Sequence, residues 1–416
     1  MPSPVWCRQV TARNKIFTLP INENALRLYP YWVTIPGFIC TYDDQQSIFM
    51  NVTSLPTHCL DQLPSAVLKA APEDFQVDEV LGFEPDGEGD HLWINIRKRN
   101  KNTRDVADEI ASTFSIAAKD VGYSGLKDRN AVTTQWFSLP LGGGGVSEGL
   151  TIDSEDLFEM VENKLAGLSE IDLVTVTRSR KKLRTGAHRT NQFKIILREV
   201  SGGQEIIGRQ LEQIRQQGFP NYFGVQRFGH GGRNIASARS MFQGNRKTSR
   251  FKRGLYLSAV RSYLFNLVLA ARVKDKSWQT VMAGEVCILN GTNSVFHCES
   301  PDAEIILRYQ QCDIHPSGPL YGRGRSAATG LVAELENTCL RDESLFLQGL
   351  EKAGLKQERR SLRAVADQLQ WQWLDENTLQ LQVTLQRGVY ATTFLREFVC
   401  VRDTQIPAEF DEKVNT

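Results

Sequence analysis

"GYSGLKDRNAVTTQWFSLP", residues 122–140, joins a glycine-framed turn to a run of residues that favour β-strands. Three consecutive charges, Lys127, Asp128 and Arg129, interrupt the small and apolar residues of the turn. Residues 133–139 that follow are rich in threonine and aromatic side chains, which are common in strands. We therefore expect a sheet at this point, with a carboxylate between two cations at its edge.

Strand-like runs continue on both sides of that stretch. Residues 91–99, HLWINIRKR, and residues 378–388, TLQLQVTLQRG, alternate apolar and polar side chains. Residues 172–180 and 191–200 read as two further strands. Many strands, few helices and hairpin-like loops indicate an α+β fold with a mainly antiparallel sheet rather than a doubly wound one. The late strand at 378–388 is expected to rejoin the first sheet, which leaves the middle of the chain as an insertion.

Three segments have the pattern of helices. Residues 103–116 repeat apolar side chains at helical spacing, and Thr103 is the expected N-cap. Residues 205–217 are expected to form a helix that ends at Gly218. Residues 254–272 are expected to form the longest helix, with one apolar side.

The composition, 41% hydrophobic and 23% charged, is ordinary for a soluble globular protein. A chain of 416 residues suffices for two or three domains. The eight cysteines form no CxxC pair, so we expect reduced thiols and no metal site. We see no signal peptide and no apolar run of membrane-spanning length, so we expect a cytoplasmic protein without a membrane partner. Nothing implies a protein partner, and we expect a monomer.

Three basic tracts stand out in a chain whose formal net charge is only +1. They span residues 97–104, 178–189 and 227–253, and the third holds eight Arg or Lys and no Asp or Glu. Aromatic residues lie among them. Since cations hold phosphates and rings stack on exposed bases, the tracts favour a polyanionic partner over a merely solvated face. The candidate contacts to a phosphate backbone are Arg178, Lys181, Lys182, Arg184 and Arg227.

No cofactor motif accompanies these tracts. The glycine run 142–145 is not a phosphate loop, because no Lys-Ser or Lys-Thr follows it, and HGGRN at 230–234 lacks a GxSxG partner. We therefore expect side-chain chemistry without a cofactor, and Asp128 is the strongest candidate. Lys127 and Arg129 would keep its carboxylate ionised if their charged ends lie near it. An ionised Asp serves as a nucleophile or a general base; a solvated turn former is the alternative.

The stretch GLKDRNAVTTQW closely resembles the signature of the TruD family of tRNA pseudouridine synthases. Other segments resemble that family in the same order, and the resemblance runs from about residue 65 to 405. These segments are LKAAPEDFQVDEVLGFEPDGEGDH (68–91), NQFKIILREV (191–200), PNYFGVQRFG (220–229) and RSYLFN (261–266).

This resemblance implies a catalytic domain of pseudouridine-synthase fold that is split by an inserted α+β TRUD domain. We expect the catalytic domain to comprise residues 50–218 and 371–406, and the inserted domain residues 219–370. Residues 1–49 lie outside the resemblance and are expected to be an N-terminal extension of unreadable role or the product of a mis-set start. Residues 407–416 are expected to be a tail.

The resemblance also implies an activity, the isomerisation of uridine to pseudouridine in tRNA, typically at position 13 and without a cofactor. It implies that Asp128 is the nucleophile that acts on a flipped-out uridine. Phe75, Asn191 and Tyr390 fall where family members line the uridine pocket, and Lys69 matches a basic residue near that site. Whether the carboxylate attacks the base, attacks the sugar or deprotonates the sugar is open.

The chain departs from the family pattern at two positions. Tyr390 stands where a phenylalanine is expected, which adds a hydroxyl, and Asn130 stands where a histidine is common. Other interpretations of the site residues stay open: Phe75 and Tyr390 as core packing, Asn191 as a strand-edge cap, and Arg227 as a brace of the inserted domain. Rival functions are a non-catalytic tRNA-binding protein or chaperone, and an RNA methyltransferase that would need a cosubstrate.

Overall fold

The computed structural model describes residues 6–10, 16–20, 55–57, 63–141, 154–245 and 247–403. The chain forms two compact units, Met1–Ile48 and Phe49–Thr416. In the first unit, β1 (Trp6–Val10) pairs antiparallel with β2 (Ile16–Pro20). The rest of the predicted extension, the glycine run 142–145 and the predicted tail 407–416 lie outside the described residues.

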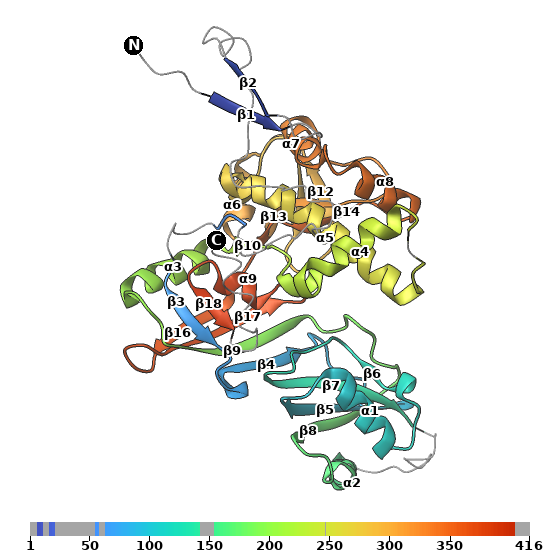
Figure 1. Ribbon diagram of the computed structural model, residues 1–416. Coiled ribbons are helices and arrows are strands. Elements are labelled where there is room, and N and C mark those ends of the chain that lie inside the picture. Colours follow the sequence, from blue (N-terminus) through green and yellow to red (C-terminus); the bar gives the residue numbers. More distant parts are fainter. Residues whose placement is uncertain are drawn as a thin grey trace. The chain divides into compact units, whose positions relative to one another are not determined.

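The second unit contains a ten-stranded sheet that carries the strands expected from the sequence (Figure 1). Seven strands follow one path: β16 (Asp367–Trp373), β17 (Leu379–Gln386), β9 (Thr190–Arg198), β4 (Phe75–Val80), β7 (Val132–Pro140), β5 (His91–Arg99) and β8 (Ile171–Ser179). Beside that path lie β3 (Ser65–Leu68), β6 (Gly122–Tyr123) and β18 (Cys400–Asp403). Among the described strands of this sheet, only β4 with β7 and β3 with β18 pair parallel. The prediction of an α+β fold with a mainly antiparallel sheet is confirmed.

The C-terminal part of the chain returns to this sheet. Strand β17 pairs antiparallel with β9 from Leu379, opposite Leu197, to Gln386, opposite Thr190. Strand β16 begins at Asp367, slightly before the predicted boundary at 371. As a result, the segments that precede β9 and those that follow β16 share one hydrogen-bonded sheet.

Helices bury the apolar side of each half of the sheet. The half around β5 and β7 packs its Leu92, Ile94 and Phe137 against α1 (Thr103–Thr113) and α2 (Ser154–Leu165). The half around β9 and β17 packs against α3 (Gln204–Gln217) and α9 (Ala391–Leu395). Helix α3 ends at Gly218 as predicted, because that residue adopts a φ of +75° and approaches the carbonyl oxygen of Ala364 too closely for a side chain.

The chain between β10 (Phe219–Pro220) and β15 (Arg363–Ala364), which pair with each other, forms the inserted part. Its four-stranded sheet has the order β12 (Val295–Cys298), β11 (Glu285–Leu289), β13 (Ile314–Leu320) and β14 (Glu358–Ser361). Its helices are α4 (Arg233–Phe242), α5 (Arg250–Lys274), α6 (Ala303–Gln310), α7 (Gly330–Leu340) and α8 (Ser344–Lys352).

Helix α5 contributes more buried residues to the core of the inserted part than any other element, and its Leu264, Phe265 and Leu269 are fully buried. The sequence predicted no apolar run of membrane-spanning length, but α5 is long enough and apolar enough to cross a membrane. However, 67% of its apolar 18-residue stretch is buried inside the protein, as in the central helix of a packed core.

Candidate active site

Asp128 lies in the loop that joins β6 to β7, and 35% of its side chain is exposed. The backbone carbonyl of Asp128 accepts a hydrogen bond from Lys98 Nζ at 3.1 Å, and the same ammonium donates to the carbonyl of Lys101 at 2.6 Å. Burial lowers the pKa of Lys98 to about 8, although the Asp128 carboxylate opposes that shift. The ammonium of Lys98 therefore anchors the loop from below while the carboxylate stays accessible.

Thr103 helps to hold the same loop, and it is not the N-cap that the sequence suggested. The N-cap is Asn102, and Thr103 is the first residue of α1. The hydroxyl of Thr103 accepts a hydrogen bond from the backbone N–H of Lys127 at 2.9 Å and donates to Gln135 Oε1 at 2.9 Å. Because this hydroxyl is occupied by the loop, it cannot cap the helix.

The cation that faces Asp128 comes from a distant part of the sequence. Lys69 Nζ lies 3.2 Å from Asp128 Oδ2, 3.9 Å from an Asp403 oxygen and 4.4 Å from the centre of the Phe75 ring. Lys69 is buried and adopts a φ of +59°, an unusual backbone conformation for a residue with a side chain. Such strain is typical of functional positions.

Lys127 precedes Asp128 in the sequence, but its ammonium binds other partners. Lys127 turns away into the interior, where its ammonium lies 2.8 Å from Glu79 Oε2 and donates to Asn191 Oδ1 at 2.7 Å. The side chains of Lys127 and Glu79 are 6% and 0% exposed. Lys127 therefore pairs with Glu79 rather than with Asp128, and Lys69 is the lysine beside the Asp128 carboxylate.

His188 closes this buried polar cluster on one side. Its Nδ1 lies 2.5 Å from Ser124 Oγ and 3.6 Å from Glu79 Oε2, and its Nε2 lies 3.5 Å from Asn191 Nδ2. Burial lowers the pKa of His188 to about 4, with the charges of Lys127 and Arg387 adding to the shift. The imidazole is therefore neutral at pH 7.

The two predicted ring residues differ in their surroundings. Phe75 is 2% exposed and packs edge-on against Phe193 at 5.9 Å in the core beneath β9. Tyr390 is half-buried at the start of α9, and a Cβ on Gly224 would lie 2.8 Å from its ring. Of the two residues, only Tyr390 is partly exposed.

The side chain of Arg227 forms a hydrogen bond with the hydroxyl of Tyr390. Arg227 Nε donates to Tyr390 Oη at 3.0 Å, and Arg227 Nη1 donates to Ser258 Oγ at 3.2 Å. The guanidinium also lies 5.4 Å from the centre of the Phe223 ring. This geometry favours the bracing role for Arg227 over the phosphate contact that we also predicted.

The inserted part reaches Asp128 through the 3-10 helix Val225–Phe228. Gln226 Nε2 donates to Asp128 Oδ1 at 3.4 Å, next to the Arg227 contact with Tyr390. Asp128 is therefore flanked by Lys69 from the ten-stranded sheet and by Gln226 from the inserted part.

Three of the four remaining predicted phosphate contacts, Lys181, Lys182 and Arg184, belong to the loop between β8 and β9. In this basic loop, residues 180–189, the side chains of Lys181, Lys182 and Arg184 are exposed. The backbone N–H of Gly186 donates to the Ser124 carbonyl at 2.6 Å, so the basic loop lies beside the loop of Asp128. Arg178, at the end of β8, instead donates to the Gly89 carbonyl at 2.9 Å.

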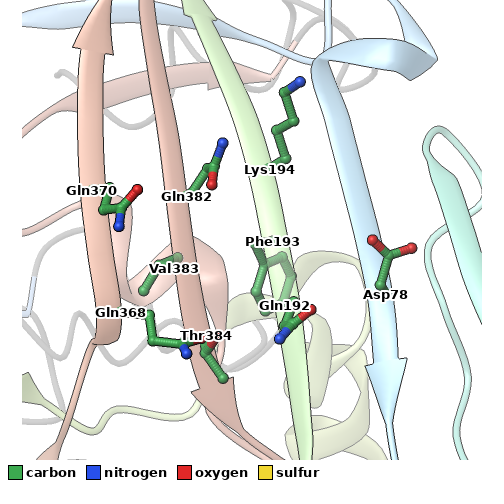
Figure 2. A pocket seen from close by; sticks show the side chains of 9 residues that line it. All are labelled: Asp78, Gln192, Phe193, Lys194, Gln368, Gln370, Gln382, Val383 and Thr384. Carbon is green, nitrogen blue, oxygen red and sulfur yellow. Dashed lines mark hydrogen bonds between the residues drawn. The ribbon is translucent and has the colours of Figure 1, made fainter.

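A pocket of about 420 Å³ lies over β16, β17, β9 and β4 (Figure 2). Its lining includes Asp78 and Gln192, which pair across the strands. Glu79 and Asn191, the next pair along the same strands, point to the opposite face because side chains alternate. The pocket in Figure 2 is therefore separate from the site around Asp128.

Sequence reasoning missed four residues of the site, Glu79, Lys98, His188 and Gln226. Two of them left a signal, because each is a charged residue in the inward phase of an alternating strand. Lys98 follows Ile94 and Ile96 in β5, and Glu79 follows Val77 in β4. A charge at such a position is buried and must find a partner. Gln226 left no comparable signal.

Comparisons with known proteins agree with this structure. The family model described as tRNA pseudouridine synthase D (TruD) matches residues 64–249 and 233–398. A tRNA pseudouridine synthase D from Methylococcus capsulatus is 42% identical, over 80% of this chain and 90% of that protein. One from Nitrosococcus oceani is 42% identical over 81% of this chain and 91% of that protein.

The crystal structure of a protein from Methanosarcina mazei has a similar fold. The TM-score is 0.62 at 20% identity, over 82% of this chain and 95% of the other. With the family model and the close relatives covering most of the chain, this protein belongs to the TruD family of tRNA pseudouridine synthases.

Proposed function

We propose that this chain isomerises uridine to pseudouridine in tRNA, at position 13, and that Asp128 opens the glycosidic bond. The single observation that carries the proposal is the setting of Asp128. Its carboxylate is accessible, pairs with Lys69 at 3.2 Å and lies on a loop bonded to the basic loop through Gly186 and Ser124. Membership of the TruD family supplies the reaction class.

The proposed reaction needs few groups. The N1–C1′ bond of uridine breaks, the base turns, and a C5–C1′ bond forms; C5 loses a proton and N1 gains one. Atoms and electrons balance within the nucleotide, so one carboxylate and a pocket that retains the free base are sufficient. An accessible carboxylate that is held in place by a buried ammonium can act as a nucleophile or accept a proton.

The base must leave its stack to reach Asp128. Extrusion of a nucleotide costs a few kcal/mol, and stacking on an aromatic ring returns about 1–3 kcal/mol. Tyr390 is the better placed of the two predicted rings, since Phe75 is 2% exposed and supports the site from within the core. Asn191 offers an amide to the edge of the uracil.

The basic loop, residues 180–189, would grip phosphates of the tRNA with little reading of its sequence. Gln226, from the inserted part, provides the opposite wall at Asp128. We propose that the protein acts as a monomer without a protein partner, and that it works in the cytoplasm, where its substrate is found.

The proposal is tested by incubating purified protein with unmodified tRNA transcripts and mapping pseudouridine at single-nucleotide resolution. We expect pseudouridine at position 13 without any added cofactor. A tRNA-binding protein or chaperone would bind the transcripts and leave every uridine unchanged. A methyltransferase would yield a methylated product only after S-adenosylmethionine is added. Either result would refute the proposed reaction.

A further inference from the structure

The amide of Asn191 is held from behind by a buried ammonium. Lys127 Nζ donates to Asn191 Oδ1 at 2.7 Å and lies 2.8 Å from Glu79 Oε2. The side chain of Glu79 is fully buried, and that of Lys127 is 6% exposed. Three residues from β4, β9 and the loop of Asp128 therefore form one compact polar unit.

This contact fixes which way the amide points. An ammonium has only donors, so the atom that faces it must be the amide oxygen. A flipped amide would bring its NH₂ group against the ammonium of Lys127 and lose the hydrogen bond. The Nδ2 atom of Asn191 is accordingly turned away from Lys127, and lies 3.5 Å from His188 Nε2.

The ion pair of Lys127 with Glu79 calls for a reason beyond stability. Desolvating two charges is costly, and a buried ion pair adds little stability compared with apolar residues of the same size. The ammonium of Lys127 does not pair with the Asp128 carboxylate, whose lysine partner is Lys69. The ammonium of Lys127 can therefore influence the substrate only through its hydrogen bond to Asn191.

A fixed amide distinguishes the two pyrimidine bases. Uracil presents the acceptor O4 beside the donor N3–H, whereas cytosine presents the donor N4–H₂ beside the acceptor N3. An amide of fixed orientation offers its N–H to a uracil carbonyl and the second lone pair of its oxygen to N3–H. Cytosine in the same register meets donor with donor and acceptor with acceptor, which is a large penalty in a buried site.

We propose that the Lys127–Glu79 ion pair acts as a positioning device that locks Asn191 in the orientation that selects uracil over cytosine. This inference rests on the proposed function. Lys127 and Glu79 act through Asn191 and need not touch the base. An amide released from Lys127 flips freely and no longer reads the edge of the base.

The test measures the single-turnover rate of pseudouridine formation with uridine, 4-thiouridine or 2-thiouridine at the target position. Sulfur accepts hydrogen bonds weakly, so at least one thio substitution should slow the parent protein about tenfold, the effect of one lost hydrogen bond. The thio penalty is the ratio of the rate with uridine to the rate with the thiouridine. In the double variant Lys127→Met/Glu79→Gln, uridine itself should react about tenfold slower, and the thio penalty should fall to about twofold or less. General structural damage would slow all three substrates equally and leave the penalty intact.

Lys164→Met is the matched control, since Lys164 belongs to α2, packs over the Phe114 ring and lies outside the polar unit. It should keep the parent penalty. A full thio penalty in the double variant, or no penalty with either analogue in the parent protein, overturns the inference. Absence of product from uridine with the parent protein would instead refute the proposed function. Should the double variant fail to fold, Lys127→Met alone removes the ammonium that holds Asn191 Oδ1, and it must show the same fall in penalty.

Discussion

Lys69 Nζ lies 3.2 Å from Asp128 Oδ2, although the two residues are 59 positions apart in the sequence. The lysine reaches this place with a buried side chain and a left-handed backbone. A non-glycine residue in that conformation costs about 1–3 kcal/mol, so the surrounding sheet must stabilise it. The parallel pairing of β3 with β18, which also brings Asp403 to Lys69, provides that support.

Replacement of Lys69 by Met should slow the reaction and leave tRNA binding nearly unchanged. A hydrogen bond to a charged group contributes about 1.5–3 kcal/mol, so kcat should fall roughly 10- to 100-fold. The measurement is pseudouridine formation under single-turnover conditions, with the tRNA Kd measured in parallel. Lys101→Met, which breaks an ion pair with Glu109, is the control. Parent-like kcat in Lys69→Met would show that Lys69 does not orient Asp128.

Tyr390 should act through its ring rather than its hydroxyl. Tyr390→Phe removes the acceptor for Arg227 Nε but keeps the stacking surface, so the rate should stay within about threefold of the parent. Tyr390→Ala should lose about 1–3 kcal/mol of stacking, which is a loss of roughly 5- to 150-fold. Rates of pseudouridine formation decide the point. Equal rates in Tyr390→Ala and the parent would remove the ring from the uridine pocket.

His188 should make the protein sensitive to acid. The ordinary pKa of histidine is 6.5, and burial lowers the pKa of His188 to about 4. Between these values only the unfolded chain binds the proton, so stability that is present above pH 6.5 is lost as the pH falls towards 4. At pH 5 the loss amounts to about 2 kcal/mol.

His188→Gln keeps a hydrogen-bonding group beside Ser124 but does not titrate. Denaturant unfolding at pH 7 and pH 5 gives the free energy of unfolding for both proteins. The parent should lose more stability than His188→Gln between the two pH values. An equal loss in the two proteins would mean that His188 is not held neutral in the folded state.

The double variant Lys181→Gln/Lys182→Gln should weaken tRNA binding and flatten its salt dependence. Each phosphate contact adds about 0.7–0.9 to the slope of log K against log salt, so the slope should fall by about 1.5. Binding titrations at several salt concentrations measure this directly. Lys164→Gln/Arg209→Gln, on α2 and α3, removes the same charge and should leave the slope unchanged. Identical slopes in both double variants would take the basic loop out of tRNA binding.

The fold was largely readable because its elements obey local rules. Alternation in residues 91–99 and 378–388 predicts β5 and β17, and the end of α3 at Gly218 follows from the left-handed conformation that glycine allows. The late strand was expected to rejoin the first sheet, and β17 pairs with β9. These features depend on short stretches of sequence.

The contacts within the site were less readable because they join distant segments. Adjacency in the sequence made Lys127 and Arg129 the candidate partners of Asp128, yet Lys127 pairs with Glu79, and Lys69 lies beside Asp128. Likewise, the sequence predicted Thr103 as a helix cap, but its hydroxyl accepts a hydrogen bond from the backbone N–H of Lys127. No local pattern encodes which of several lysines reaches a carboxylate across the sheet.

The most direct test of the central claim is Asp128→Asn, which keeps the size of the side chain and removes its charge. Purified parent and variant are incubated with the same tRNA transcript, and pseudouridine and tRNA binding are both measured. We predict that the variant binds the tRNA with near-parent affinity and forms no pseudouridine, while the parent converts the target uridine. Pseudouridine formation by Asp128→Asn at the parent rate would contradict the role of this carboxylate.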